Sequence, residues 1–341
     1  MERLNPALPA LARPHGGPDA RGAARFDFST NSNACGPCPM ALQALQQADA
    51  SRYPDATYSR LRLQLATFHG VAPQRVALAG SASEFIFRIT AWAARSGLRR
   101  VQLPRHGYGD YRAAAEAWGL GEAASGPALG WACDPSSPLG QVPDDLAGWA
   151  SADGVRVLDR AYEPLRLQGQ GGLDAAGLQR VWQLFSPNKA LGLTGVRAAY
   201  AIAPQGAQQQ VDELAALCPS WPLGAHGVAL LESWCQVATQ DWLAAARERL
   251  RDWKVEQLAL LEQLGWQTRS SVANFVLTAP APAWLRPAAQ LELRARGIQW
   301  RDAASFGLPG WVRLAVLPPA AQQALAQAVA GQDSALKKGN P

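Results

Sequence analysis

Apolar and polar positions follow two alternating patterns along the first two thirds of the chain. Short apolar runs are typical of buried strands, and apolar residues spaced three or four apart are typical of helices. The runs expected to be strands are residues 75–80, 100–104, 155–162, 180–187 and 196–204. The segments expected to be helices are residues 40–47, 57–70, 84–97 and 111–119. Strands that alternate with helices predict an α/β fold with a mainly parallel sheet.

The rest of the chain has a different pattern. Residues 225–264 have helical periodicity almost throughout, and so long an element often bridges two domains. The segments after it are expected as strand, helix, strand and helix, over residues 273–282, 285–298, 310–318 and 319–332. This order predicts a small α+β domain. We therefore expect a large domain over residues 41–235, a small domain over 236–332, an N-terminal arm over 1–40 that forms part of the small domain, and a tail over 333–341.

Composition excludes several classes of protein. The 341 residues are 48% hydrophobic and 17% charged, which is enough to build a large buried core. No apolar run is long enough to cross a bilayer and the N-terminus lacks the apolar stretch of a signal peptide, so we expect a cytoplasmic protein without a membrane partner. The net charge of +5 is scattered, which favours small anions over nucleic acid as partners. The four histidines lie far apart, so no metal site is expected.

The segment Cys35-Gly36-Pro37-Cys38 has the same four residues as the dithiol of a thioredoxin. A thioredoxin dithiol follows a strand, and a tryptophan commonly precedes its first cysteine, whereas Ala34 precedes this one. The chain holds five cysteines, and an odd number without a secretory signal argues against a disulfide framework. A dithiol redox protein remains an alternative, but the neighbouring residues favour a coincidental match to the thioredoxin motif.

Three short segments contain the candidate chemistry. Lys189 follows an expected strand and lies among small and apolar residues, which favour the neutral amine that Schiff-base chemistry needs. Ser186 precedes it by three residues, and Arg197 follows it by eight. Asp159 ends another strand, and the small residues 80–83 open a helix whose free N–H groups suit a phosphate.

These segments together resemble the motifs of fold-type I enzymes that depend on pyridoxal 5'-phosphate (PLP). The resemblance implies a large PLP-binding domain with a mainly parallel seven-stranded sheet and a small α+β domain. It implies that Lys189 is the catalytic lysine that binds the cofactor covalently. It also implies that Asp159 contacts the pyridine nitrogen and that Tyr162 donates a hydrogen bond to the 3-oxygen of the ring. The cofactor phosphate would contact Ser81, Ala82, Ser83, Ser186 and Arg197, and Tyr108 would stack on the ring.

The sequence departs from that pattern at two positions. Ser137, in "CDPSSPLG" (133–140), stands where the family has an asparagine that contacts the 3-oxygen. Arg160 stands where a glutamate usually follows the aspartate. The chain is also somewhat short between Tyr162 and Lys189. These departures leave open a non-catalytic protein with the same fold.

Segments near both ends resemble the L-threonine-O-3-phosphate decarboxylase family of cobalamin biosynthesis. They are "RPHGG" (13–17), "RFDFSTNSNACGPCP" (25–39), "SRYPDATYSRLRLQLATFHGV" (51–71) and "RDAASFGLPGWVRLAV" (301–316). The resemblance implies that four residues form the substrate site: Asn31, Arg313, Arg301 and His15. Arg313 would bind the substrate carboxylate, and Arg301 and His15 would bind its phosphate. Tyr53 would reach the cofactor phosphate of a neighbouring subunit, which implies a homodimer with shared active sites. Cys35 falls at a variable position of that family.

The expected function is therefore PLP-dependent decarboxylation of L-threonine O-3-phosphate to (R)-1-aminopropan-2-ol O-phosphate. The alternative is a PLP-dependent aminotransferase similar to histidinol-phosphate aminotransferase, which shares most of the cofactor motifs. Both reactions use a phosphorylated amino substrate. Residue types barely separate them, because the choice of the bond that breaks depends on fine positioning of the substrate.

Overall fold

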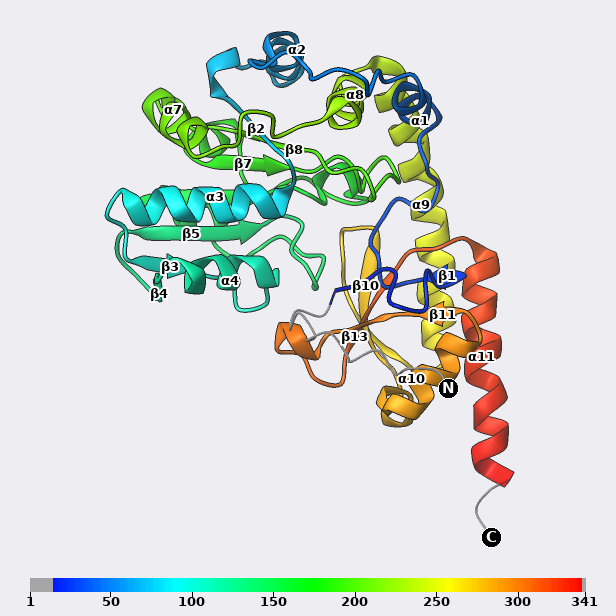
Figure 1. The fold of residues 1–341 in the computed structure, drawn as a ribbon. Helices are drawn as coiled ribbons and strands as arrows, with labels where there is room; N and C mark the ends of the chain where they lie inside the picture. Colours follow the sequence, from blue (N-terminus) through cyan, green and yellow to red (C-terminus); the bar gives the residue numbers. More distant parts are fainter. Residues whose placement is uncertain (1–14, 339–341) are drawn as a thin grey trace, which may run out of the picture.

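The structure has two parts that are joined by the long helix α9 (Val237–Gln263) (Figure 1). It is a computed structural model that describes the backbone of residues 15–338 and the side chains of residues 15–330. The first part is built on a large sheet of seven strands, and the second on a small sheet of four. A two-stranded pair, β1 (Phe26–Asp27) with β11 (Ile298–Gln299), joins the N-terminal arm to the second part.

The large sheet confirms the predicted mainly parallel seven-stranded architecture. Its strands lie in the order β2-β8-β7-β6-β5-β3-β4, and β8 runs antiparallel to both its neighbours while the other pairs are parallel. The strands are β2 (Val76–Ala79), β3 (Arg100–Gln102), β4 (Gly121–Glu122), β5 (Ala128–Cys133), β6 (Gly154–Asp159), β7 (Trp182–Phe185) and β8 (Ala199–Ile202). Parallel strands place their carboxyl ends at one edge, where ligands bind in such sheets.

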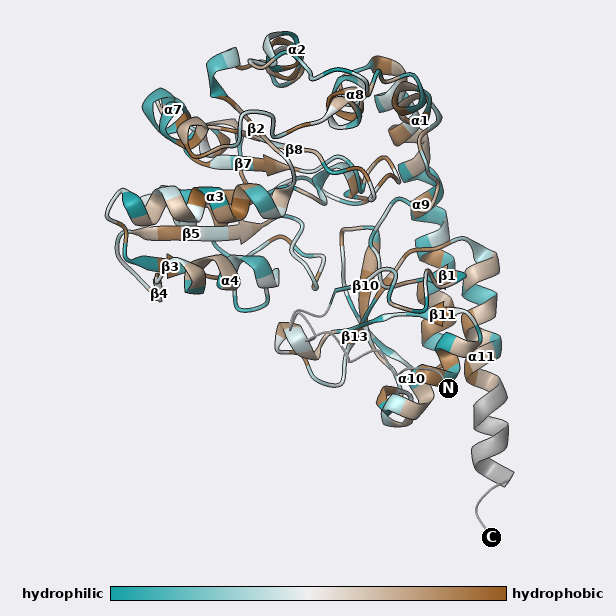
Figure 2. Cartoon of the chain, viewed as in Figure 1, coloured by the Kyte–Doolittle hydropathy of each residue, from teal (hydrophilic) through white to brown (hydrophobic). Residues whose placement is uncertain are grey.

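Helices cover both faces of this sheet and bury its alternating side chains. One apolar core lies between the sheet and α1 (Pro39–Gln46), α2 (Ser59–His69) and α8 (Ala225–Trp234), which lie together at the top of Figure 1. The other core lies between the sheet and α3 (Ala82–Arg95), α4 (Gly109–Ala117) and α7 (Gln208–Ala216). The short helices α5 (Leu146–Ser151) and α6 (Ala175–Leu178) pack on residues of β5 and β6. Figure 2 shows hydrophobic residues along much of β5.

The central strand β5 was missed by the sequence analysis, although it pairs with β6 over six residues. Its middle residue is Gly130, and a glycine inside a strand weakens the sequence signal. The structure explains this glycine, because a Cβ there would lie 2.5 Å from a guanidinium nitrogen of Arg156. The Arg156 side chain crosses this position to donate a hydrogen bond to the carbonyl of Ala128.

The small sheet of the second part is antiparallel in the order β12-β13-β10-β9, with β9 (Gln267–Arg269), β10 (Phe275–Ala279), β12 (Arg301–Asp302) and β13 (Val312–Ala315). The helices α10 (Pro287–Ala295) and α11 (Pro319–Lys338) belong to this part. The four elements expected in the second part correspond to β10, α10, β13 and α11, and the structure adds the short strands β9, β11 and β12. Helix α11 continues into the segment from residue 333 that was expected to be a tail. Within residues 15–338, no helix is both long and apolar enough to cross a membrane.

His69, at the end of α2, accepts a hydrogen bond inside the first core. Its Nε2 lies 2.9 Å from the hydroxyl of Tyr200, and that hydroxyl accepts the indole N–H of Trp234 at 3.0 Å. In the tautomer that carries its proton on Nδ1, the neutral imidazole of His69 accepts the proton that Tyr200 donates. Burial, together with repulsion from Arg160, lowers the pKa of His69 from its ordinary 6.5 to about 4.

We expect His69 to make the fold sensitive to acid. Its pKa in the folded state is depressed, so its contribution to stability is present above pH 6.5 and is lost as the pH falls towards 4. At about 1.4 kcal/mol for each pH unit, the loss is about 3 kcal/mol at most. Urea unfolding between pH 7 and pH 4 should show a steeper decline for the wild type than for His69→Gln, which cannot titrate. Parallel declines would refute this assignment.

Candidate active site

A cavity of about 840 Å³ opens at the carboxyl ends of the parallel strands, between the large sheet and the small sheet. Strands β5, β6 and β7 end at its floor, and β12 and β13 contribute side chains from the opposite side. All the residues proposed for the site line this cavity except Tyr53. They are His15, Asn31, Ser81, Ala82, Ser83, Tyr108, Ser137, Asp159, Tyr162, Ser186, Lys189, Arg197, Arg301 and Arg313.

Lys189 lies in a tight turn just after β7. The backbone of this turn is fixed from outside, because Asn33 donates its N–H to the carbonyl of Lys189 at 2.9 Å. The Nζ of Lys189 lies 3.3 Å from the Oγ of Ser186 and 5.6 Å from the ring centre of Tyr162. The amine therefore faces the cavity between a hydroxyl and an aromatic ring.

Asp159 is the last residue of β6 and lies buried on the cavity floor. Its Oδ1 accepts the backbone N–H of Ala161 at 2.9 Å, and its Oδ2 accepts the hydroxyl of Tyr111 at 2.6 Å. Burial raises the pKa of Asp159 above its ordinary value. Since both hydrogen-bond donors are neutral, the buried carboxylate would gain from a cationic partner in the cavity.

Tyr111 is a site residue that the sequence analysis missed. It lines the cavity, bonds Asp159 and stacks on Trp131 with a centroid distance of 4.5 Å and an interplanar angle of 12°. Its spacing of three residues after Tyr108 places both rings on one side of α4, and this was the available signal. Burial raises the pKa of Tyr111 well above its ordinary value, so the phenol stays protonated as a donor.

The amino end of α3 forms the side of the cavity near Arg197. Ser81 caps this helix, since its hydroxyl accepts the N–H of Glu84 at 3.0 Å. The hydroxyls of Ser83 and Tyr108 lie 3.2 Å apart. Burial raises the pKa of Tyr108 to about 12. Free N–H groups, two serines and Arg197 make this end suited to a phosphate group.

Two arginines on the small sheet form the opposite side of the cavity. Arg301 and Arg313 are direct partners on the antiparallel strands β12 and β13. Arg313 donates to the Oγ of Ser137 at 2.8 Å and to the carbonyl of Ser29 at 3.0 Å, and Arg301 donates to the Oγ of Ser305 at 2.6 Å. Burial lowers the pKa of both groups, and repulsion by Arg313 adds to the effect at Arg301. Two buried neighbouring cations favour an anionic ligand.

The N-terminal arm enters the same cavity. Gly17 donates its N–H to the Oγ of Ser29 at 2.8 Å, and a Cβ at Gly16 would lie 2.2 Å from the carbonyl oxygen of Ser29. This close approach needs glycine and places His15 at the cavity, 6.0 Å from Tyr108 between ring centres. The amide of Asn31 is only 2% exposed, and neither of its polar atoms has a partner among the described residues. Buried amides are normally hydrogen-bonded, so Asn31 is suited to contact a ligand.

A family model for aminotransferases of class I and II matches residues 122–329. The chain belongs to this family. It is 27% identical over 328 residues to the histidinol-phosphate aminotransferase of Ruegeria pomeroyi, with 89% of each chain covered.

Two solved structures have the same fold. The histidinol-phosphate aminotransferase of Sinorhizobium meliloti in complex with PLP has a TM-score of 0.76 at 21% identity, with 90% of each chain covered. The L-threonine-O-3-phosphate decarboxylase of Porphyromonas gingivalis has a TM-score of 0.65 at 20% identity, over 86% of this chain and 92% of that one. The relatives' names support the aminotransferase alternative better than the decarboxylase that the sequence analysis preferred.

The class I and II aminotransferase family uses PLP, and the residues of the cavity fit this cofactor. The cavity brings together an amine on Lys189, a buried carboxylate without a cationic hydrogen-bond partner and a cradle of N–H and O–H donors. Arg160 stands at the position where the family usually has a glutamate. It does not line the cavity, and its guanidinium donates a hydrogen bond to the side-chain oxygen of Gln183 at 2.8 Å. It therefore does not obstruct the cofactor.

Two features of the sequence lie outside the cavity. Tyr53 is 77% exposed and stacks on Trp221 at a centroid distance of 4.4 Å, so it does not serve the cavity of its own chain. Cys38 is fully buried in the first core, and burial raises the pKa of the partly buried Cys35. A reactive dithiol needs an exposed thiol of lowered pKa, so the structure argues against the redox alternative.

Proposed function

We propose that this chain is a PLP-dependent aminotransferase whose amino substrate carries a phosphate group. The observation that carries the proposal is the pair of neighbouring buried guanidiniums, Arg301 and Arg313, opposite the amine of Lys189 in one cavity. The histidinol-phosphate aminotransferases that this chain resembles over most of its length support the same substrate class.

The proposed roles follow from the position of each group. Lys189, Asp159 and the donors at the amino end of α3 would hold PLP, which, when bound, draws electrons away from the substrate carbon that bears the amine. The amine of Lys189 would accept the proton from that carbon and deliver it to the cofactor, not back to the same carbon, so that the amine stays with the cofactor and the substrate leaves as a carbonyl compound. Arg301 and Arg313 bind the anionic groups and so fix the direction of the bond that breaks. Tyr108 lies next to Ser83, at the side of the cavity that is suited to the phosphate group.

Two neighbouring binding sites for anionic groups are useful to an aminotransferase, because two different substrates must enter the same cavity in turn. Histidinol phosphate carries one anionic group, whereas an oxo-dicarboxylate that accepts or supplies the amine carries two. Arg301 and Arg313, as neighbours on β12 and β13, would serve both.

Decarboxylation of L-threonine O-3-phosphate is the second candidate. Its supporting observation is the arm, in which the close approach of Gly16 to Ser29 places His15 in the cavity that Arg301 and Arg313 also line. This substrate carries a carboxylate and a phosphate at once, which matches Arg313 and Arg301 with His15. Arg313 would hold the substrate carboxylate and so position it as the group that leaves.

The reactions are distinguished by their products. The purified protein, loaded with PLP, is incubated with L-histidinol phosphate and 2-oxoglutarate, and separately with L-threonine O-phosphate. Glutamate formation in the first mixture is expected. Carbon dioxide released from the second mixture, without need for an oxo acid, would replace the proposal with the decarboxylase. Neither product, in a protein that binds PLP, would favour a non-catalytic member of the fold.

We also propose a homodimer in which Tyr53 serves the partner's cavity. The support is a largely exposed aromatic ring whose position is fixed by stacking on Trp221, which itself donates to the carbonyl of Pro54 at 3.1 Å. Mixing Tyr53→Ala with the inactive Lys189→Ala should restore activity, because hybrid dimers contain one intact site. If the mixture, after subunit exchange, has only the activity of its Tyr53→Ala component, the shared site is wrong.

A further inference from the structure

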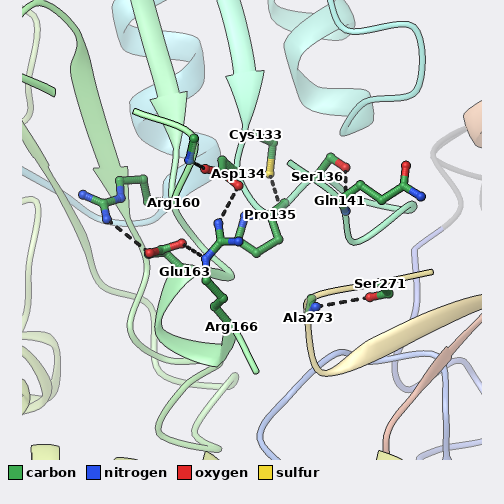
Figure 3. Close-up of polar contacts among 11 residues, drawn as sticks. Cys133, Asp134, Pro135, Ser136, Gln141, Arg160, Glu163, Arg166, Ser271 and Ala273 are labelled. Atoms are coloured by element: carbon green, nitrogen blue, oxygen red, sulfur yellow. Dashed lines mark hydrogen bonds and ion pairs between the residues drawn. The ribbon is translucent and has the colours of Figure 1, made fainter. Parts of the chain in front are cut away.

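Four charged side chains lie together behind the active-site cavity: Asp134, Arg160, Glu163 and Arg166 (Figure 3). Arg166 lies 2.5 Å from an oxygen of Asp134 and 2.7 Å from an oxygen of Glu163. The other oxygen of Glu163 lies 3.6 Å from Arg160. None of the four lines the cavity. We call this set the charge cluster.

The charge cluster connects the two loops that carry cavity residues. Asp134 belongs to the loop after β5, three residues before Ser137, while the other three members belong to the loop after β6. In that second loop Arg160 follows Asp159 directly, and Glu163 follows Tyr162 directly. The ion pair of Asp134 with Arg166 is therefore a direct link between the loop of Ser137 and the loop of Asp159 and Tyr162.

The central ion pair is deeply buried. Asp134 is 3% exposed and Arg166 is 8% exposed. The second oxygen of Asp134 accepts the N–H of Gly172 at 2.8 Å, so both carboxylate oxygens have partners. The two acids and two bases of the charge cluster cancel in charge. Apolar residues of similar shape are often as stable as such a pair, so stability alone does not account for it.

The segment that carries Arg166 also contacts the second part of the molecule. Leu167 donates its N–H to the carbonyl of Val272 at 2.7 Å and accepts the Nε–H of Arg251, from α9, at 2.7 Å. The loop around Val272 is held in turn by Lys254, which donates to the carbonyls of Ser271 and Ala273. The charge cluster is thus placed where the two parts meet.

We propose that Asp134 and Arg166 are positioning residues. Their ion pair fixes the loop that carries Asp159 and Tyr162 relative to the loop that carries Ser137, the hydrogen-bond partner of Arg313. This inference rests on the proposed function, because it assigns the cavity to PLP and a phosphorylated substrate. It also explains the departure at Arg160, since the acid expected at that position occurs three residues later as Glu163 and remains in the same charge cluster.

The test compares three variants: Asp134→Asn, Arg166→Met and the double variant. Arg166→Met leaves the buried Asp134 without its cationic partner, and Asp134→Asn leaves the charge cluster with one excess positive charge, so each single variant is expected to lower the melting temperature. The double variant removes one acid and one base, so the charge cluster stays neutral and the melting temperature returns towards that of the wild type. Its kcat is expected to fall about tenfold or more, because small displacements of reacting groups are costly.

A spectroscopic readout separates positioning from folding. The absorption of bound PLP changes with pH, and its midpoint reports the surroundings of Lys189 and Asp159. In the double variant this midpoint should shift by about half a pH unit or more, although the net charge nearby is unchanged. The dissociation constant for PLP, measured on the cofactor-free protein, should rise. Wild-type values of kcat, midpoint and dissociation constant in a stable double variant would overturn the inference.

The matched control is Arg112→Met with Glu122→Gln, which removes an exposed ion pair of 2.8 Å and should change none of these quantities. The design also separates this inference from the proposed function. If the wild type transforms neither phosphorylated substrate, the proposed function fails, while the midpoint and the dissociation constant for PLP still test the role of Asp134 and Arg166.

Discussion

Replacement of Lys189 by alanine is expected to abolish turnover and to remove the visible absorption of lysine-bound PLP. Lys189 lines the cavity, and its amine faces the open space next to Ser186. Alanine has no amine to carry the cofactor or to move a proton at the substrate carbon. We expect kcat to fall by about 10⁴-fold or more. Stopped-flow absorbance and product assays on the same preparation measure both effects.

Lys254 supplies the matched control for this prediction. It is a buried lysine on α9, but its ammonium donates to the carbonyls of Ser271 and Ala273 and it does not line the cavity. Lys254→Met should lower stability and keep the absorption of lysine-bound PLP. Should that absorption persist in Lys189→Ala and vanish in Lys254→Met, the catalytic lysine would be misassigned.

The sequence predicted those helices and strands whose apolar residues follow a regular spacing along the chain. The helical periodicity of residues 84–97 and the apolar run before Asp159 correspond to α3 and β6 because each element buries one continuous set of side chains. Strand β5 was missed because Gly130, against which the side chain of Arg156 packs, interrupts its apolar run. Strands of two or three residues, such as β12, are too short to produce a periodic pattern.

Some residues lining the cavity lie at recognisable local positions, whereas His15, Asn31, Arg301 and Arg313 could be proposed only from the resemblance to a known family. Asp159 ends a strand, Ser81 caps a helix, and Lys189 follows a strand in a turn of small residues. Contacts between distant segments had no such signal. Tyr111 meets Asp159 across 48 residues and Arg166 meets Asp134 across 32, so both partnerships become visible only in the folded chain.

The second large effect is expected at Asp159. Asp159→Asn keeps the shape of the side chain but removes the negative charge that would face the pyridine nitrogen of PLP. The carboxylate is buried and its hydrogen-bond donors, Tyr111 and Ala161, are neutral, so a cation in the cavity would stabilise its charge. Loss of that charge weakens the ability of the ring to accept electrons. We expect kcat to fall about 100- to 1,000-fold, the size usual for a preorganised electrostatic contact.

Tyr111→Phe distinguishes the charge of Asp159 from its position. This variant removes the hydroxyl that bonds Oδ2 at 2.6 Å but keeps the carboxylate and the stacking on Trp131. If charge dominates, its kcat should fall far less than that of Asp159→Asn, while the pH midpoint of the bound cofactor shifts because the carboxylate loses a donor. Equal losses in the two variants would instead mean that orientation of the carboxylate by Tyr111 limits the reaction. A fully active Asp159→Asn would mean that Asp159 does not face the cofactor ring at all.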